Sequence, residues 1–256
     1  MKHNWDAENY HKISDFQEQL GRKLIIEFKG HSPRSVCDVG CGTGRVTRIL
    51  ADHFPHAMIY AIDPDPGMLE EARKNLGDLS HRIRFLPSDA SSLRLPEPVD
   101  LLFSNFVFQW ISNYQILFKN LYKVLALDGF LIAQWPTKKR GNLVLEEKLR
   151  FHNQFKKYFK NWVDPAHYST KEEAKNLLSR ARFHTIQVQQ FNPRTDFDSR
   201  ERFASFARTV KLRHYLPYLP DSETEARFVD CYADGILEEM GKYSLDVTCL
   251  KVTARK

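Results

Sequence analysis

Short apolar runs alternate with helical patterns over the first half of the chain. Five runs are predicted to be buried strands, because they are mostly apolar at consecutive positions instead of at every second one. These runs are residues 35–39, 58–62, 83–86, 101–103 and 130–135. Continuous apolar strands that are separated by amphipathic helices predict a parallel sheet with helices on both faces, which is an α/β fold.

Amphipathic helices are predicted between these strands from apolar residues that recur every three or four positions. Their apolar faces consist of Val46, Ile49, Leu50 and Phe54; of Met68, Leu69, Ala72 and Leu76; and of Leu117, Leu121 and Leu125. Two apolar runs near the end of the sequence, residues 185–191 and 246–254, are further strand candidates.

Three more helical patterns fall outside this alternation. Their apolar positions are Ile13, Phe16, Leu20 and Leu24; Phe151, Phe155, Phe159 and Trp162; and Val229, Tyr232, Ile236 and Met240. No repeat or long linker divides the sequence, so we predict a single domain over residues 1–256. Its core is expected at 34–136, with helical additions at 1–30, 140–180 and 192–242. The additions form either a lid over the active site or further cover for the core.

The composition is that of an ordinary globular protein, with 42% hydrophobic and 27% charged residues. The formal charge of +6 suits anionic small partners, but the basic residues are spread along the chain, and nucleic-acid binding would need them on one face. No apolar run approaches the ~20 residues of a membrane span, and none of signal-peptide length follows Met1. We therefore expect a cytoplasmic protein that neither spans a membrane nor binds nucleic acid.

The cysteines give no sign of a disulfide or a metal site. Cys37, Cys41, Cys231 and Cys249 form no CxxC pair, and the first two lie in or beside a glycine-rich turn. A disulfide or a zinc ion would interfere with that turn, so we expect reduced packing residues and no metal.

The strongest local signal is an apolar strand that leads directly into the glycine-rich turn Gly40-Cys41-Gly42-Thr43-Gly44. Glycines are needed where a turn is tight and a ligand approaches the backbone closely. The dinucleotide fingerprint requires a glycine where this chain has Arg45, and no Gly-Lys-Ser/Thr of a phosphate-binding loop follows. Asp38, two residues before the first glycine, would repel a pyrophosphate and attract an ammonium group. These details argue against NAD as the ligand of this turn.

Polar residues follow the next three strands. Asp63 ends the second strand, where a carboxylate accepts hydrogen bonds from both hydroxyls of a ribose. Asp89 follows the third strand and can accept from an adenine amino group, with the backbone N–H of Ala90 beside it. Asn105 follows the fourth strand. All of these positions lie at the carboxyl ends of consecutive strands, where open α/β sheets bind their ligands.

These motifs resemble those of the class I S-adenosylmethionine-dependent methyltransferases over roughly residues 34–136. The resemblance also includes Met68-Leu69 after Asp63, and Asp100 at the start of the fourth strand. It implies a Rossmann-like, mostly parallel sheet of seven strands whose last strand is antiparallel, with S-adenosylmethionine as cofactor. The glycine turn would face the methionine part, Asp63 the ribose, and Asp89 with Ala90 the adenine. The expected cofactor-binding residues are Asp38, Gly40, Cys41, Gly42, Asp63, Pro64, Asp89, Ala90 and Asn105.

The segment after the fourth strand indicates the acceptor. Methyltransferases of amide nitrogens and nucleobase amines commonly carry Asn/Asp-Pro-Pro-aromatic there, whereas this chain has Ser104-Asn105-Phe106-Val107. The stretch that ends at Trp110 is similar to its counterpart in carboxyl methyltransferases of trans-aconitate, malonyl-acyl-carrier protein, juvenile-hormone acid and salicylate. In the last two a Trp and a Gln hold the substrate carboxylate, and the resemblance assigns these roles to Trp110 and Gln17. Residues 5–10 resemble the segment that folds over the cofactor in the first two.

We therefore predict a methyltransferase that esterifies a small-molecule or acyl-carrier-bound acid. A carboxylate needs no general base at neutral pH, unlike an amine, a hydroxyl or a carbon acid. The alternative is transfer to the carbon or oxygen of a lipid, quinone or other natural product, which a histidine near Trp110 would favour. A third interpretation is a cofactor-binding protein without activity, and a fourth, suggested by the pI alone, is an RNA-modifying enzyme. The aromatic residues Phe151, Phe155 and Phe159 are expected in a lid or pocket wall.

Overall fold

The computed structural model describes residues 5–28, 31–137 and 143–256. The chain forms two compact units, each of which is described by itself. The first comprises Met1–Thr137, Ala166–Phe191 and Cys249–Lys256, and the second comprises Lys138–Pro165 and Asn192–Thr248. The ends of the predicted additions at residues 1–4, 29–30 and 140–142 lie outside the described residues.

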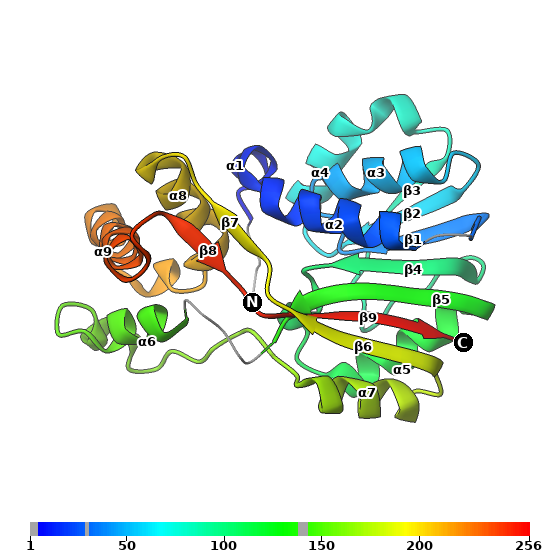
Figure 1. The fold of residues 1–256 in the computed structure, drawn as a ribbon. Helices are drawn as coiled ribbons and strands as arrows, with labels where there is room; N and C mark the ends of the chain where they lie inside the picture. Colours follow the sequence, from blue (N-terminus) through cyan, green and yellow to red (C-terminus); the bar gives the residue numbers. More distant parts are fainter. Residues whose placement is uncertain (1–4, 29–30, 138–142) are drawn as a thin grey trace. The chain divides into compact units, whose positions relative to one another are not determined.

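A seven-stranded sheet forms the centre of the first unit (Figure 1). Its strands are β1 (Ser35–Val39), β2 (Met58–Asp63), β3 (Ile83–Pro87), β4 (Val99–Asn105), β5 (Leu125–Pro136), β6 (His184–Phe191) and β9 (Cys249–Arg255). Their order across the sheet is β3-β2-β1-β4-β5-β9-β6, and β9 runs antiparallel to both of its neighbours. The predicted mostly parallel sheet of seven strands with an antiparallel last strand is confirmed.

Helices cover both faces of this sheet, because both faces are apolar. The helices of this unit are α1 (Ala7–Ile13), α2 (Asp15–Glu27), α3 (Arg45–His53), α4 (Pro66–Asn75), α5 (Tyr114–Val124) and α7 (Lys171–Arg180), with 3₁₀ turns η1 (Gly77–Leu79) and η2 (Phe108–Trp110). On β4, Leu101 and Phe103 belong to the apolar cluster of α2, α3 and α4, whereas Leu102 belongs to that of α5 and α7. A membrane crossing would need a longer apolar helix than any found in the described residues.

Helix α7 belongs to the first unit, where Ala174 and Leu178 are buried in the same cluster as α5. The predicted addition at 140–180 is therefore divided between the two units. That the helical additions cover the active site within a single domain stays a prediction.

The second unit has an apolar core of its own. Its elements are α6 (Leu143–Phe151), η3 (Lys156–Phe159), β7 (Arg194–Asp196), α8 (Arg200–Phe206), the π-helical turn η4 (Ala207–Lys211), η5 (Leu216–Tyr218), α9 (Ser222–Met240) and β8 (Ser244–Asp246). Helix α9 buries Val229, Tyr232 and Ile236, which confirms the helix that was predicted from their spacing. Strands β7 and β8 pair in antiparallel orientation.

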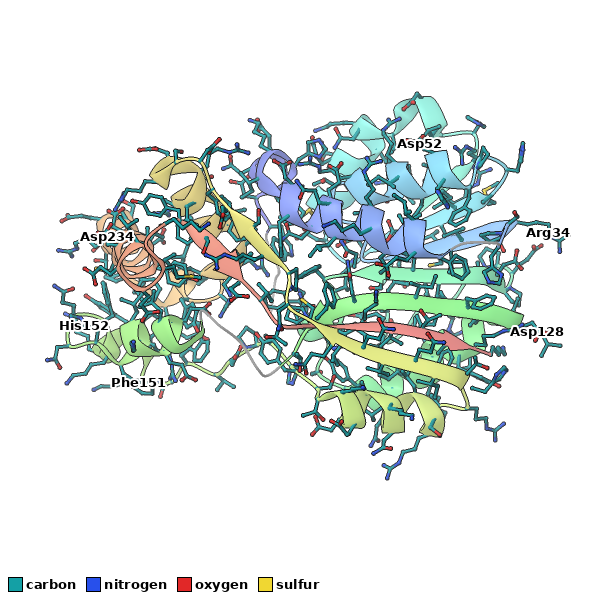
Figure 2. The ribbon with its side chains drawn as sticks, viewed as in Figure 1. Arg34, Asp52, Asp128, Phe151, His152 and Asp234 are labelled. Carbon is teal, nitrogen blue, oxygen red and sulfur yellow. The ribbon has the colours of Figure 1, made fainter. Side chains whose placement is uncertain are left out.

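We had expected one helix from Phe151 to Trp162, and this expectation is wrong. Helix α6 ends at Phe151, and the chain turns before η3 begins. The rings of Phe155 and Phe159 are buried against Phe228 of α9, whereas Phe151 is 65% exposed on the outside of α6 (Figure 2). The helical spacing of these aromatics is therefore incidental, because packing within the core of the second unit determines where the rings lie.

The predicted strand at 246–254 is divided in a similar way. Asp246 ends β8 in the second unit, and β9 of the first unit begins only at Cys249. The apolar pattern continues across this change of unit, so the sequence does not mark the boundary.

We expect Phe155→Ala to lower the free energy of unfolding by about 3–5 kcal/mol, because it leaves a cavity in the core of the second unit. Phe151→Ala removes a ring of the same size that is mostly exposed, and it should change the free energy by no more than about 0.5 kcal/mol. Urea denaturation followed by circular dichroism measures both values. Equal losses in the two variants would contradict the assignment of Phe155 to the core.

Candidate active site

A cavity of about 690 Å³ opens at the carboxyl ends of β1, β2, β3 and β4. Most of the residues that the sequence predicts for the cofactor line this cavity. They are Gly40, Gly42, Asp63, Pro64, Asp89, Ala90 and Asn105. The parallel register explains the convergence, because each of these residues ends or follows its strand at the same edge of the sheet.

The glycine turn between β1 and α3 has a conformation that excludes side chains. Gly40 has a φ of +77°, and a Cβ atom there would lie 2.3 Å from Cγ2 of Val107. Gly42 has a φ of +53°, and a Cβ atom there would meet nothing nearer than the Tyr10 ring at 3.7 Å. The first glycine therefore permits close packing of two loops, and the second leaves the backbone open to the cavity.

The carboxylate of Asp63 joins the turns that follow β1 and β2. Its Oδ2 accepts a hydrogen bond from the Gly42 N–H at 3.0 Å, and its Oδ1 accepts from the Asp65 N–H at 2.9 Å. Burial raises the pKa of Asp63 to about 6, and the two backbone N–H groups oppose the rise. Each oxygen keeps a second acceptor position, so Asp63 can still bind a pair of hydroxyl groups.

Asp65 is a buried residue of the site that the sequence analysis missed. Its Oδ1 accepts from the N–H groups of Gly67 and Met68 and caps α4, while its Oδ2 accepts from the backbone N–H of Trp5 at 3.2 Å. The signal for the cap was present, because an Asp directly before a proline that begins a helix is a strong helix start. The bond to Trp5 spans 60 positions and leaves no local signal.

Two predicted cofactor residues, Asp38 and Cys41, are not among the described residues that line the cavity. Asp38 is buried on β1, where its carboxylate accepts a hydrogen bond of 2.6 Å from the Thr47 hydroxyl. Burial raises the pKa of Asp38 to about 7; the bond from Thr47 opposes the rise and nearby Asp63 adds to it. Cys41 is buried in the cluster of α2, α3 and α4. Direct contact of these two residues with a cofactor stays a prediction.

Asn105 links the site to two other elements. Its Oδ1 accepts from Nε2 of Gln134 on β5 at 2.6 Å, and its Nδ2 donates to the backbone carbonyl of Gln17 on α2 at 2.9 Å. Gly21, one helical turn further along α2, lies so close that a Cβ atom there would be 3.3 Å from the same Nδ2. Asn105 thus helps to hold α2 against the end of β4.

Two residues were predicted to hold the methyl acceptor. Of these, Trp110 is among the described residues that line the cavity, and Gln17 is not. Gln17 is buried on α2, and its Oε1 has no hydrogen-bond partner in the described part of the chain. The ring of Trp110 meets that of Trp5 edge to face, with centroids 6.2 Å apart. The pairing of Gln17 with Trp110 around a substrate stays a prediction.

Aromatic rings of the N-terminal segment line the cavity beside Trp110. Trp5 and Tyr10 contact each other edge to face at 5.3 Å, and both line the cavity. The sequence analysis expected a covering segment at residues 5–10 but assigned no role to Tyr10. No local pattern could have identified Tyr10, because its place beside Gly42 results from packing between distant parts of the chain.

The lining of the cavity is acidic. It includes Asp63, Asp65 and Asp89, and among the described residues no His, Lys, Arg or Cys side chain lines it. Each of the three carboxylates accepts at least one backbone N–H bond. The site therefore suits a ligand with positive charge.

Residues 36–129 match a family described as a methyltransferase domain. Two of the similar curated proteins are trans-aconitate 2-methyltransferases. The chain is 37% identical to that of Methylobacterium nodulans over 133 residues, which make up 52% of this chain and 50% of the relative. It is 29% identical to that of Sinorhizobium medicae over 240 residues, or 91% of this chain and 89% of the relative. The chain spans about half the length of several of the curated relatives that it matches.

The fold is shared with solved methyltransferase structures. Phosphoethanolamine N-methyltransferase 2 of Haemonchus contortus, in complex with phosphomonomethylethanolamine and S-adenosylhomocysteine, gives a TM-score of 0.63 at 16% identity. The likeness covers 93% of this chain and 52% of that chain. At this identity it shows a common fold.

We expect Asp38→Asn to become more stable than the parent protein as the pH rises from 4 to 8. The native state keeps a proton on Asp38 up to a pKa of about 7, whereas the ordinary value is 3.8, so folding opposes ionisation and wild-type stability falls across this window. The two pKa values differ by about three, which corresponds to at most about 4 kcal/mol in the free energy of unfolding at pH 8. Asn keeps an acceptor for the Thr47 hydroxyl. Urea denaturation at a series of pH values measures the difference.

Asp78→Asn is the control of opposite sign. The ion pair with Arg48 lowers the pKa of Asp78, so this carboxylate stabilises the native state at neutral pH, and its loss should matter less in acid. If the stability of Asp38→Asn followed that of the parent protein at every pH, the Asp38 carboxyl would titrate normally and our account of its burial would be wrong.

Proposed function

We propose that the chain is a class I methyltransferase that transfers a methyl group from S-adenosylmethionine to a carboxylate of a small-molecule acid. The match of residues 36–129 to a methyltransferase domain and the order of the strands support this proposal. The relatives named trans-aconitate 2-methyltransferase support an acid as acceptor. A carrier-bound acid stays a prediction, because no feature of the described residues favours it.

The residues of the cavity fit this cofactor at three points. The methionine part would lie on the open backbone at Gly42, where no side chain intervenes before Tyr10. The free acceptor positions of Asp63 would take the ribose hydroxyls. The N–H of Ala90 donates to no acceptor among the described residues and would bind the adenine, with Asp89 beside it. The acidic lining also matches the positive charge on the cofactor's sulfur.

The single observation that carries the choice of acceptor is that no histidine or lysine lines the cavity among the described residues. When bound, S-adenosylmethionine supplies a methyl group on a sulfonium, which is already an activated leaving group. The chain itself has to align the acceptor oxygen and exclude water. The rings of Trp5, Tyr10 and Trp110 line the cavity and would exclude water from a bound substrate. A carboxylate is the oxygen nucleophile that reacts without losing a proton, so it suits a lining without a histidine or lysine in the described residues.

Trp110 would position the acceptor. It belongs to the short turn η2, which comes after β4, and it lines the cavity together with Gly40 and Gly42. The indole N–H can only donate, which suits an anionic oxygen and not a protonated amine. In this role Trp110 orients the carboxylate and takes no part in proton transfer.

Methyl transfer is tested with isotopically methyl-labelled S-adenosylmethionine and a panel of small di- and tricarboxylic acids that includes trans-aconitate. We expect label in a product that mild base hydrolyses, because methyl esters are base-labile and methyl ethers and amines are not. Label that withstands base would exclude a carboxylate as acceptor. Absence of transfer to any acid, together with transfer to a phenol or a lipid, would favour the alternative acceptor class.

We expect Trp110→Phe to lower kcat/KM about ten- to a hundredfold for the acid that accepts the label. The substitution keeps an aromatic ring in the cavity and removes one N–H donor, whose bond to a carboxylate is worth about 1.5–3 kcal/mol. The Kd for S-adenosylhomocysteine and the Tm should hardly change.

Trp135→Phe is the matched control. Trp135 is fully buried on β5, and its Nε1–H donates to the Ser169 hydroxyl at 3.3 Å. Its loss should lower the Tm and leave kcat/KM within about twofold of the parent value. If Trp110→Phe instead behaved like this control, Trp110 would be a packing residue and its proposed role would be wrong.

A further inference from the structure

Helix α1 brings two aromatic rings to the cavity but has almost no apolar attachment of its own. It contains Tyr10 and follows Trp5, and none of its residues is buried. Helix α2, by contrast, buries Phe16, Leu20 and Leu24 in the first unit. Polar contacts must therefore position α1 against the rest of the first unit.

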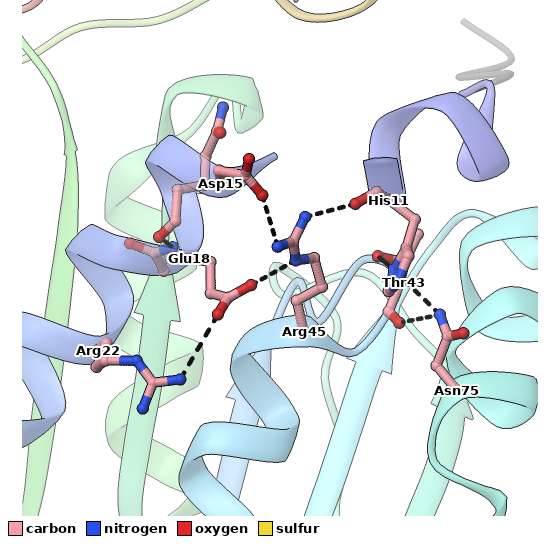
Figure 3. Close-up of polar contacts among 9 residues, drawn as sticks. His11, Asp15, Glu18, Arg22, Thr43, Arg45 and Asn75 are labelled. Carbon is pink, nitrogen blue, oxygen red and sulfur yellow. Dashed lines mark hydrogen bonds and ion pairs between the residues drawn. The ribbon is translucent and has the colours of Figure 1, made fainter. Parts of the chain in front are cut away.

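Arg45 makes three polar contacts around the joint between α1 and α2 (Figure 3). Its Nη1 donates to the backbone carbonyl of His11 at 2.5 Å, near the end of α1. Its Nη2 and Nε donate to the carboxylates of Asp15 and Glu18 in the first turn of α2, at 2.7 and 2.5 Å. One guanidinium thus binds both sides of the joint between α1 and α2.

Arg45 is also the first residue of α3 and directly follows the glycine turn. The position that departs from the dinucleotide fingerprint therefore connects the turn with the N-terminal helices. A second contact runs parallel to it: Nδ1 of His11 lies 3.0 Å from the Thr43 hydroxyl and 3.1 Å from Nδ2 of Asn75. These bonds join α1 to the same glycine turn that faces Tyr10.

We propose that Arg45 is a positioning residue of the transfer site, which holds α1 so that the rings of Tyr10 and Trp5 cover the cofactor. The inference rests on the proposed function, because it places S-adenosylmethionine in the cavity that these rings line. Without the three bonds of Arg45, the joint at Ser14 is held by fewer contacts, and α1 is in place for a smaller fraction of the time. A ligand that needs the covered state then binds more weakly in proportion to that fraction.

Arg48 provides a matched control. It lies one helical turn further along α3 and has a similar set of bonds: two to the carboxylate of Asp78, at 2.7 and 3.0 Å, and one to the backbone carbonyl of Asn75, at 2.5 Å. No bond of Arg48 in the described residues reaches α1 or α2. The two arginines thus differ in that Arg45 bonds α1 and α2 directly, whereas Arg48 reaches α1 only through Asn75, whose side chain contacts His11.

Calorimetric titration of the full chain with S-adenosylhomocysteine, at neutral pH, tests the proposal. We expect Arg45→Met to raise the Kd about tenfold, which corresponds to α1 in place for about a tenth of the time. Arg48→Met should raise it less than about twofold, and the two variants should have similar Tm values. Arg45→Lys, which keeps the charge but forms fewer of the bonds, should give an intermediate Kd.

A double-mutant cycle with Tyr10→Ala separates positioning from general structure. If Arg45 acts through the covering ring, Arg45→Met should weaken binding less than about threefold in a chain that already lacks the Tyr10 ring. An undiminished tenfold effect would overturn the proposal, as would equal effects of Arg45→Met and Arg48→Met. Failure of the parent protein itself to bind S-adenosylhomocysteine would show that the proposed function, and this inference with it, is wrong.

Discussion

The carboxylate of Asp63 holds the candidate site together. One oxygen accepts from the turn after β1, and the other accepts from the turn after β2. Asp65, fixed in this way, caps α4 and binds the backbone of Trp5, so two adjacent carboxylates order three separate segments. The arrangement is unfavourable for the charge itself, because burial raises the pKa of Asp63. Burial of the Asp63 carboxylate therefore costs folding free energy. In return, the backbone of the site is already in position before a ligand binds.

The sheet and the cofactor side of the site were predictable, because they depend on local patterns. A continuous apolar run predicts a strand that is buried on both faces, and a polar residue where it stops predicts a place at the ligand edge. From these patterns we predicted the strands β1 to β5 and the common location of Asp63, Asp89 and Asn105, which line one cavity in the structure. The requirement for a glycine at position 40 was also predictable. Its close contact with Val107 was not, because that contact depends on where β4 ends.

The remaining features depend on contacts between distant parts of the sequence. Arg45 attracted notice only as a departure from a fingerprint, and its bonds to Asp15 and Glu18 follow from the way α2 packs on α3. Phe155 and Phe159 have helical spacing yet belong to two different local structures, because the second unit packs both rings against α9. Periodicity records which residues avoid water, and it does not record against which element they are buried.

The absence of buried residues in α1 has a consequence for the rate at which the protein could exchange ligands. Segments without a buried apolar face open at free energies far below that of global unfolding. A segment held by a few polar bonds can therefore detach and return many times while the seven-stranded sheet stays intact. Such local opening gives a ligand a way in and out that is independent of the stability of the fold. In the proposed reaction, the strength of those bonds would limit turnover: weak bonds would leave the ligand exposed, and bonds that are too strong would make product release the slow step.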